Sequence, residues 1–596
     1  MISRENRFEI GNSASNAGGT KDPTQVSDAG RPDAVPDWRL LQNAPSAVRL
    51  YYRSLSATEI VLWCLLYVTV LAGILYHAKG PGLSNDSYQY LSEAENIYNG
   101  HGLTTSIVHF DTERAHGRVP APLTTFPPGY SLAIAAISRT GLARETAGLI
   151  LSAASFISLV PLIACTAGLL ELSAMATRMA LVLLLGNSAA GLYATAVVTE
   201  SLFTALALSA LLCLLLHERA NGGTPAAAAG NLLVACACWV RYAGLFLFVA
   251  AGAHLAWRAF RRRDRRSVIA SACLALPAAL ISCLLVRNMV LTGSWKGGNT
   301  KAVAHPLAAV LKQFGVSTYH LFFGEGVATR LGALQVTLGV GLILSSVLLF
   351  VTVARVASSS GIRAALGRAF PGAGLLLVYV VVYNAGIIYL GMFSVISFGS
   401  RMFYPLLPVY FLLSGLILTR LQALPGARSA PLAWTACAAI IVGSYWSINL
   451  ENTMVHRPVS PDRVVEASFA VPSGTGGSLR SWFDANVPLG AVIVATNGQA
   501  TAYVLKRKVI SLVGSYYSDQ RWDEKEVRAL MQRYGAAFLI LYPRIDPMIE
   551  PVQQESAFLQ ALIEGRRPQW LQLAADNGQV MIFQCPAAWA ATSNKN

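Results

Sequence analysis

Long apolar runs are the feature that most restricts how this chain can fold. Between residues 59 and 448 the sequence repeatedly joins about 20 mostly apolar residues, which is roughly the length that an α-helix needs to cross a bilayer. A soluble domain usually carries about 25% charged residues, whereas 13% of this chain is charged and 54% is hydrophobic. The pattern therefore predicts an all-α, polytopic membrane bundle with appended parts.

The apolar runs predict about eleven membrane spans. Short loops separate most of the runs, so we expect the spans to form one integral bundle. The segment 129–138 is apolar but too short to cross, and we interpret it as a re-entrant or interfacial helix. The predicted spans are 59–77, 146–170, 178–198, 200–217, 226–240, 242–259, 268–291, 331–355, 372–396, 402–420 and 431–448.

Positive charge is concentrated in particular loops. When the N-terminus is placed in the cytoplasm, alternate crossings put most loop arginines inside, including the run "RAFRRRDRR" at 258–266, as the positive-inside rule requires. Membrane topology therefore accounts for the net charge of +15, and we predict no nucleic-acid partner. An odd number of spans leaves the C-terminus outside.

Composition divides the chain into three parts. Residues 1–57 are mostly polar and predict a disordered cytoplasmic tail. Residues 58–448 form the transmembrane domain, with a first large outer loop at 77–146 and a second at 292–330. Residues 449–596 combine short β-branched runs with an amphipathic helical segment, which predicts a small periplasmic α/β domain.

Charged residues at the outer ends of the spans are informative because charge exposed to lipid is costly. They are Glu200, Arg241, Arg287 and Arg401. Snorkelling to the headgroups would explain Arg287 and Arg401, but it explains Arg241 and Glu200 less well because their neighbours are apolar. Three arginines and a carboxylate at one depth favour binding of an anionic headgroup such as a lipid phosphate.

The first outer loop contains further carboxylates. Asp86 and Ser87 open a helical pattern, "SYQYLSEAENIYNG", and Asp86 can be interpreted simply as its N-cap. A capping position would also fix the carboxylate close to the membrane surface. Asp111 and Glu113 follow in the same loop, where ordinary loop charges are the simpler interpretation.

Several short motifs follow one another along the predicted membrane domain. The acidic residue after the first span is followed by "PPGY", "TESLF", "RYAGLFLF", "LVRNMVLTGS" and "SRMFYPLLPVYFLL". Motifs in this order resemble the GT-C class of integral-membrane glycosyltransferases. Within that class the chain resembles the protein O-mannosyltransferases and the bacterial aminoarabinose and lipopolysaccharide-core sugar transferases. The resemblance covers roughly residues 59–448.

The resemblance implies transfer of a sugar from a polyprenyl-phosphate donor, with inversion, to a glycan, lipid or protein acceptor at the outer face of the inner membrane. The general base of the family falls on Asp86. Arg241, Arg287 and Arg401 would hold the donor phosphate. Many members have two adjacent acids where this chain has Asn85 and Asp86, so the second acid is missing or comes from elsewhere, such as Asp111.

No cofactor is predicted with certainty. A divalent metal would be compatible with the chemistry of the family, but the sequence has no His, Asp and Glu cluster with metal-ligand spacing. Cys236 and Cys238 lie in a predicted span without the second ligand pair that structural zinc needs.

Two other functions compete with glycosyl transfer. A transporter or flippase would explain the spans and their charges, but it predicts repeated halves and does not require a long first loop. A ligase or polymerase for lipid-linked glycans uses the same donors on the same face, and the sequence separates it poorly from the first interpretation.

Overall fold

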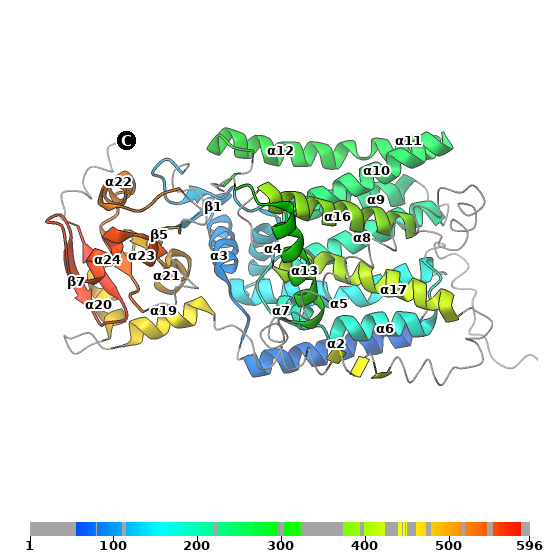
Figure 1. Ribbon diagram of the computed structural model, residues 1–596, viewed down its shortest axis with the longest axis horizontal. Coiled ribbons are helices and arrows are strands. Elements are labelled where there is room, and N and C mark those ends of the chain that lie inside the picture. The colour runs from blue at the N-terminus through cyan, green and yellow to red at the C-terminus, as the bar shows by residue number, and fades with distance from the viewer. Residues whose placement is uncertain are drawn as a thin grey trace, which may run out of the picture. The chain divides into compact units, whose positions relative to one another are not determined.

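The computed structural model (Figure 1) describes residues 55–78, 80–109, 115–219, 224–263, 265–295, 297–298, 303–324, 373–393, 399–422, single positions between 439 and 449, 460–471, 478–514, 519–544 and 552–585. Residues 1–54 of the predicted tail and the predicted span 331–355 lie outside these residues, and so does most of the span 431–448. Asp111 and Glu113 also lie outside them.

Apolar helices form the larger part of the described chain. They are α2 (Ala57–Ala78), α5 (Arg144–Leu169), α6 (Ala174–Leu185), α7 (Ser188–Ala194), α8 (Glu200–Arg219), α9 (Thr224–Val240), α10 (Gly244–Arg262), α11 (Arg265–Ala272), α12 (Ala275–Thr292), α13 (Leu307–Phe323), α16 (Ala373–Phe393) and α17 (Leu407–Gln422). Two short 3-10 turns, η2 (Ser400–Met402) and η3 (Tyr404–Leu406), precede α17.

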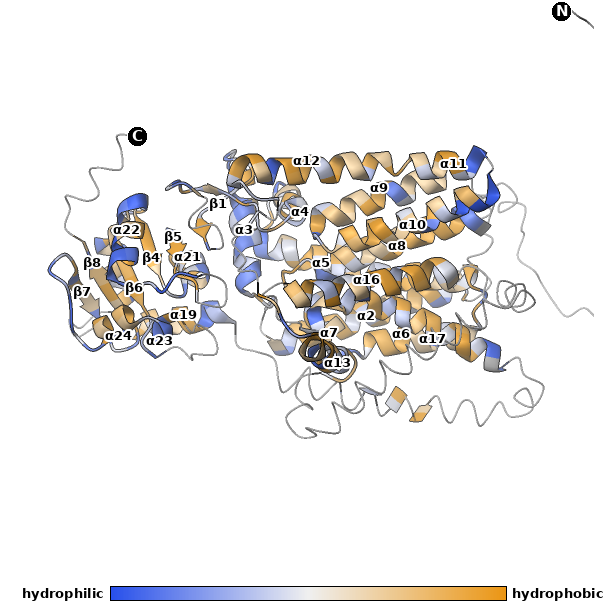
Figure 2. Cartoon of the chain, turned by 45° about the horizontal axis from the view of Figure 1, so that its top comes forward, coloured by the Kyte–Doolittle hydropathy of each residue, from blue (hydrophilic) through white to orange (hydrophobic). Residues whose placement is uncertain are grey.

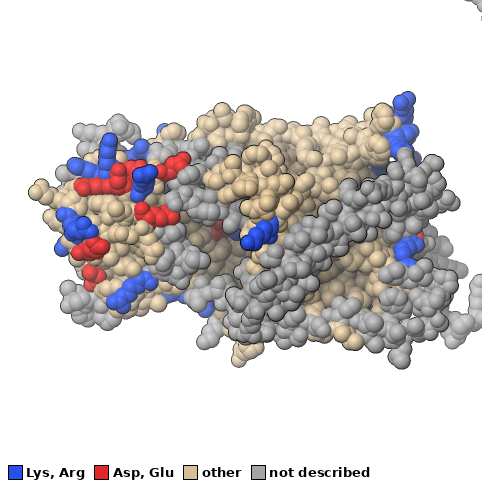
Figure 3. Space-filling view, viewed as in Figure 1, with Lys and Arg blue, Asp and Glu red and all other residues tan. Residues whose placement is uncertain are grey.

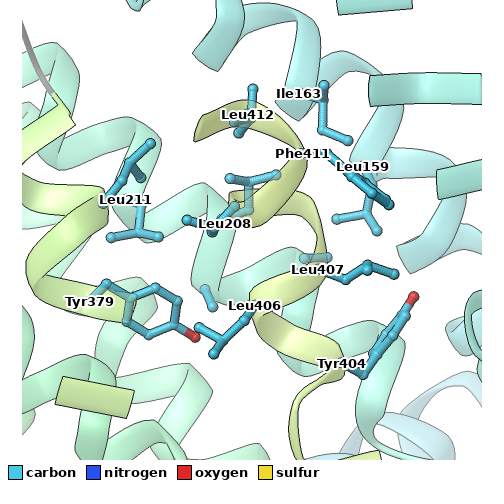
Figure 4. Close-up of a cluster of buried hydrophobic side chains, with 14 of the residues drawn as sticks. Leu159, Ile163, Leu208, Leu211, Tyr379, Tyr404, Leu406, Leu407, Phe411 and Leu412 are labelled. Atoms are coloured by element: carbon cyan, nitrogen blue, oxygen red, sulfur yellow. The ribbon is translucent and has the colours of Figure 1, made fainter. Parts of the chain in front are cut away.

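Five helices among the described residues are long and apolar enough to cross a membrane, and a bent pair makes a sixth. The chain is therefore a multi-pass membrane protein. The core of the bundle lies between α5, α8, α16 and α17, where leucines and tyrosines from distant segments interdigitate (Figure 4). The aromatic side chains of Tyr379 and Tyr404 are fully buried there.

One predicted span is broken. Residues 178–198 were expected to form a single helix, but α6 and α7 meet at an angle of 65°. Gly186 ends α6, and a Cβ atom there would lie 2.2 Å from the Trp446 indole nitrogen. Asn187 then caps α7 by accepting from the Ala190 N–H, and its amide donates to the Leu321 carbonyl and to the Tyr445 hydroxyl, both at 2.7 Å. These contacts are non-local, so hydropathy alone does not reveal the break.

The first outer loop is structured. It contains the polar helix α3 (Asn85–Tyr98), the short strands β1 (Thr104–Thr105), β2 (Ile107–Val108) and β3 (Ala121–Pro122), and the helix α4 (Gly129–Ser138). The helix α4 coincides with the segment that was too short to span. Figure 2 shows α3 as a hydrophilic helix beside the apolar bundle.

The segment from Pro461 to Gln584 carries a mixed sheet flanked by helices. Its strands are β4 (Val492–Ala495), β5 (Lys508–Ser511), β6 (Phe538–Leu541), β7 (Gln572–Asp576) and β8 (Met581–Gln584). Its helices are α19 (Pro461–Ala470), α20 (Leu479–Asn486), α21 (Gly498–Leu505), α22 (Glu524–Tyr534), α23 (Val552–Glu555) and α24 (Ala557–Ile563). We call this segment the C-terminal unit.

The sheet of the C-terminal unit is completed by the first outer loop. Its order is β2-β5-β4-β6-β8-β7, in which β2, β5, β4 and β6 are parallel and the other two pairings are antiparallel. Ile107 of β2 lies opposite Val509 of β5, so a strand far away in the sequence joins this sheet. The unit predicted at 449–596 therefore shares its sheet with the loop predicted at 77–146.

The buried amide of Asn187 gives a prediction for stability. Asn187→Ala removes the cap of α7 and leaves the Leu321 carbonyl and the Tyr445 hydroxyl without their donor. A lost cap costs about 1 kcal/mol and an unsatisfied buried group about 1–3 kcal/mol. We expect a lower thermal unfolding temperature in detergent. Asn486→Ala, at an exposed amide that bonds only within its own helix, is the control and should unfold like the parent.

Candidate active site

Four segments that are distant in the sequence bring charged side chains together. Asp86 lies in the first turn of α3, and Glu200 is the first residue of α8. Arg241 lies in the turn between α9 and α10, and Arg401 lies in η2. Three of the four residues that the sequence placed at outer span ends thus meet one another and Asp86. We call these four side chains the charged cluster.

Glu200 is the centre of the charged cluster. Its side chain is completely buried, and its Oε1 atom accepts hydrogen bonds from Arg241 Nη1 at 2.5 Å and from Arg401 Nε. Arg241 Nη1 also donates to the Thr199 hydroxyl at 2.7 Å. A carboxylate at the first residue of a helix is stabilised by the exposed N–H groups. Burial without these cationic partners would cost several kcal/mol.

Arg401 connects the buried carboxylate to Asp86. Its Nη1 atom lies 2.5 Å from Asp86 Oδ2, while its Nε atom contacts Glu200. The side chains of Arg401 and Asp86 are 33% and 18% exposed, compared with 16% and 0% for Arg241 and Glu200. Glu200 is therefore the fully buried member of the cluster, Asp86 and Arg241 are mostly buried, and Arg401 is the most exposed of the four.

The start of α3 differs from the simple interpretation of Asp86. The N-cap is Ser84, whose backbone N–H donates to the Ser87 hydroxyl oxygen at 2.9 Å, and the helix begins at Asn85. Asp86 is therefore not the capping residue, and its side chain is used in the contact with Arg401.

Arg287 is held by a different set of atoms. Its Nη1 and Nη2 atoms donate to the carbonyls of Leu123 and Leu103, at 3.0 and 3.1 Å. These two residues flank the β1–β3 pair and are themselves joined by a backbone hydrogen bond. Arg287 thus fastens the first outer loop to the end of α12, and no contact between it and the charged cluster occurs among the described residues.

Glu93 was not singled out by the sequence. It lies two helical turns after Asp86 on α3, and its side chain is fully buried. Neither carboxylate oxygen has a hydrogen bond of ordinary geometry to any residue that the structure describes. Burial raises the pKa of this carboxyl to about 8, against the opposite effects of the Ser131 hydroxyl and the Arg287 charge. The available signal was its position three residues after Tyr90, since residues at this spacing share one face of a helix.

Metal-binding groups were sought in the described part of the chain. No three His, Cys, Asp or Glu side chains come together there in a group that could hold a metal ion. Asp111, which the sequence offered as a second acid, is not among these residues.

Comparisons with known proteins identify the fold. No protein-family model matches the chain, and no curated protein sequence matches it. The structure of ArnT from Cupriavidus metallidurans bound to undecaprenyl phosphate is similar, with a TM-score of 0.52 at 13% identity, over 90% of this chain and 99% of that one. The apo state of the same protein matches with a TM-score of 0.51 at 12% identity and the same coverage.

A second kind of protein matches less well. The oligosaccharyltransferase of Archaeoglobus fulgidus in complex with zinc and sulfate gives a TM-score of 0.48 at 13% identity, over 81% of this chain and 67% of that one. The two ArnT matches support the GT-C fold that the sequence motifs predicted.

The buried carboxyl of Glu93 predicts a pH-dependent stability. Its pKa is raised from an ordinary value of 4.5 to about 8, so the folded state holds a proton that the unfolded state releases. The contribution of this group to the free energy of unfolding is fully present below pH ~4.5 and decreases as the pH rises to about 8. Glu93→Gln, which mimics the protonated form, should abolish this loss.

Thermal unfolding of the parent and Glu93→Gln proteins between pH 4.5 and 9 measures the effect. The difference in unfolding temperature should widen up to about pH 8 and then stay constant. Glu466→Gln supplies the control, because Glu466 lies on the exposed side of α19. A constant difference over the whole range would contradict the assignment.

Proposed function

We propose that this chain is a membrane glycosyltransferase that moves a sugar from a polyprenyl-phosphate donor to a hydroxyl group of a cell-envelope glycan, lipid or protein. One observation carries the proposal: a partly exposed carboxylate, Asp86, contacts an arginine that a fully buried carboxylate, Glu200, holds in place. The fold of this chain is similar to that of ArnT, one structure of which is bound to undecaprenyl phosphate.

Asp86 acts as the general base in this proposal. The acceptor hydroxyl oxygen attacks the anomeric carbon and loses its proton to the Oδ1 atom of Asp86. The bond between the anomeric carbon and the phosphate oxygen breaks, and the polyprenyl phosphate leaves with the electron pair. Attack from the face opposite the leaving group inverts the configuration of the sugar.

Arg241 and Arg401 stabilise the leaving phosphate. Negative charge grows on the phosphate as its bond to the sugar breaks, and fixed cationic donors lower the energy of that state. Both arginines have further N–H groups besides those that contact Glu200, Thr199 and Asp86. Glu200 holds the two guanidinium groups, so they need little rearrangement during the reaction. Arg287 and Asp111, which the sequence also proposed for substrate binding, stay predictions.

We place the reaction at the outer face of the inner membrane, with the N-terminus in the cytoplasm and the C-terminal unit in the periplasm. Arg241 lies three residues before the start of α10, and Arg261 and Arg262 lie in the last turn of that helix. About 28 Å of helix separates the two ends. Figure 3 shows Lys and Arg gathered at the α10–α11 end, which the positive-inside rule assigns to the cytoplasm.

The role of Asp86 is tested by Asp86→Asn. The amide retains an acceptor for Arg401 but cannot take the proton of the acceptor hydroxyl, so turnover should fall by about 100-fold to 10,000-fold. The assay is sugar release from a polyprenyl-phosphate sugar by the purified protein. Asp484→Asn removes an exposed carboxylate that pairs with Arg480 and should be fully active. Normal turnover of Asp86→Asn would remove Asp86 from the mechanism.

The role of Arg241 is tested by Arg241→Ala and Arg241→Lys. Loss of a charge-assisted hydrogen bond costs about 1.5–3 kcal/mol, so the KM for the donor should rise by about 10-fold to 100-fold for alanine, and by less for lysine. The KM for the acceptor should change little. Arg480→Ala, at an exposed arginine, is the control. A larger effect on the acceptor than on the donor would show that the phosphate binds elsewhere.

A further inference from the structure

The helix that carries Asp86 is held from two sides. Tyr90, Leu91 and Ala94 of α3 are buried in one apolar cluster with residues of α4 and α5. Tyr88 belongs to a different cluster, made with Val465 and other residues of the C-terminal unit. Figures 1 and 2 both show α3 between the bundle and this unit. Because α3 is a polar helix with few apolar residues of its own, its position depends on both sides.

The Tyr88 hydroxyl makes two hydrogen bonds to one residue of the C-terminal unit. It donates to Asp462 Oδ1 at 2.8 Å and accepts from the Asp462 backbone N–H at 2.9 Å. Asp462 lies in the first turn of α19, where backbone N–H groups lack partners within the helix. The Tyr88 hydroxyl therefore satisfies a helix end, which fixes the distance between α3 and α19.

Tyr503 of α21 joins the same contact to the bundle. Its ring lies 5.0 Å from the Tyr88 ring, between centroids, and its hydroxyl donates to Glu145 Oε1 at 2.8 Å. Glu145 is in the first turn of α5. Burial raises the pKa of both tyrosines, so both hydroxyls stay protonated and keep donating. The ammonium of Lys506 covers the Tyr503 ring at 4.1 Å.

We propose that Tyr88 and Tyr503 are positioning residues through which the C-terminal unit holds α3 in the place where Asp86 meets Arg401 and the acceptor. Tyr88 follows Asp86 by two residues, which puts their side chains about 200° apart around the helix. The first turns of α3 are thus contacted on two sides, by Arg401 at Asp86 and by residues of α19 and α21 at Tyr88. The pairing of β2 with β5 strengthens the same link.

This inference rests on the proposed glycosyl transfer and adds a task for the C-terminal unit. A rotation or shift of α3 would move Asp86 away from the proton that it accepts without removing any group that binds the donor. Positioning errors of about 1 Å cost rate rather than affinity. The expected signature is therefore a lower kcat with an unchanged KM for the polyprenyl-phosphate sugar.

The test compares Tyr88→Phe and Tyr503→Phe with the parent protein. Each change keeps the ring and removes only the hydroxyl, so kcat should fall by about 5-fold to 50-fold, with the donor KM and the unfolding temperature nearly unchanged. Tyr542→Phe is the matched control, because Tyr542 is a buried tyrosine of the same unit whose hydroxyl bonds to Thr501 at 2.6 Å. It should turn over like the parent.

Asp462 provides a rescue experiment and hydrogen exchange an independent reading. Asp462→Asn keeps an acceptor for the Tyr88 hydroxyl and should retain kcat. Asp462→Ala removes that acceptor but keeps the backbone N–H that donates to Tyr88, so kcat should fall, but by less than in Tyr88→Phe. The amides of α3 should exchange faster in Tyr88→Phe, and those of α8 should not. Unchanged kcat in both tyrosine variants of an active parent overturns the positioning role alone. A parent that transfers no sugar from any polyprenyl-phosphate donor overturns the proposed function, and the positioning role with it.

Discussion

The fully buried carboxylate of Glu200, between two arginines, is the interaction on which the other parts of the candidate site depend. It joins the start of α8, the turn between α9 and α10, and η2 before α17. Removing one partner of a buried ion pair costs about 3–5 kcal/mol, because the other charge stays behind uncompensated. The ion pairs of the charged cluster therefore also determine how these helix ends pack together. Asp86 is connected to them through Arg401.

The polar helix α3 completes the candidate site at the end of the bundle by adding Asp86 to the charged cluster. A hydrophilic helix gains little from the apolar interior of the bundle, so it stays at its end and is fixed by specific contacts. Asp86 contacts the bundle through Arg401, and Tyr88 contacts the C-terminal unit through Asp462. Arg287 fixes the rest of the loop by holding two of its backbone carbonyls. The first outer loop is thus ordered by contacts on both sides, although little of it is regular structure.

The sequence predicted what depends on composition and local pattern, and it missed what depends on distant partners. Charge in apolar surroundings singled out Glu200 and Arg241, because such charges need partners, and the structure pairs these two side chains with each other. The same argument grouped Arg287 with them, because depth in a membrane does not specify which side of a helix a residue occupies. The break at Asn187 and the buried Glu93 arise from tertiary contacts. The strand β2 has only two residues, too few for any periodicity to be visible.

The charges of the cluster fit the proposed reaction in a further way. Asp86 and Glu200 carry two negative charges and Arg241 and Arg401 two positive ones, so the cluster is neutral before substrate binds. In the proposed step Asp86 takes a proton and becomes neutral, while the phosphate goes from a diester to a monoester and gains a negative charge. The total charge around Arg401 thus stays the same as one anion replaces the other. Since Arg401 contacts Asp86 directly, a small movement of its side chain can shift its guanidinium from the base to the leaving phosphate. The net charge of this poorly solvated region therefore does not change during the step.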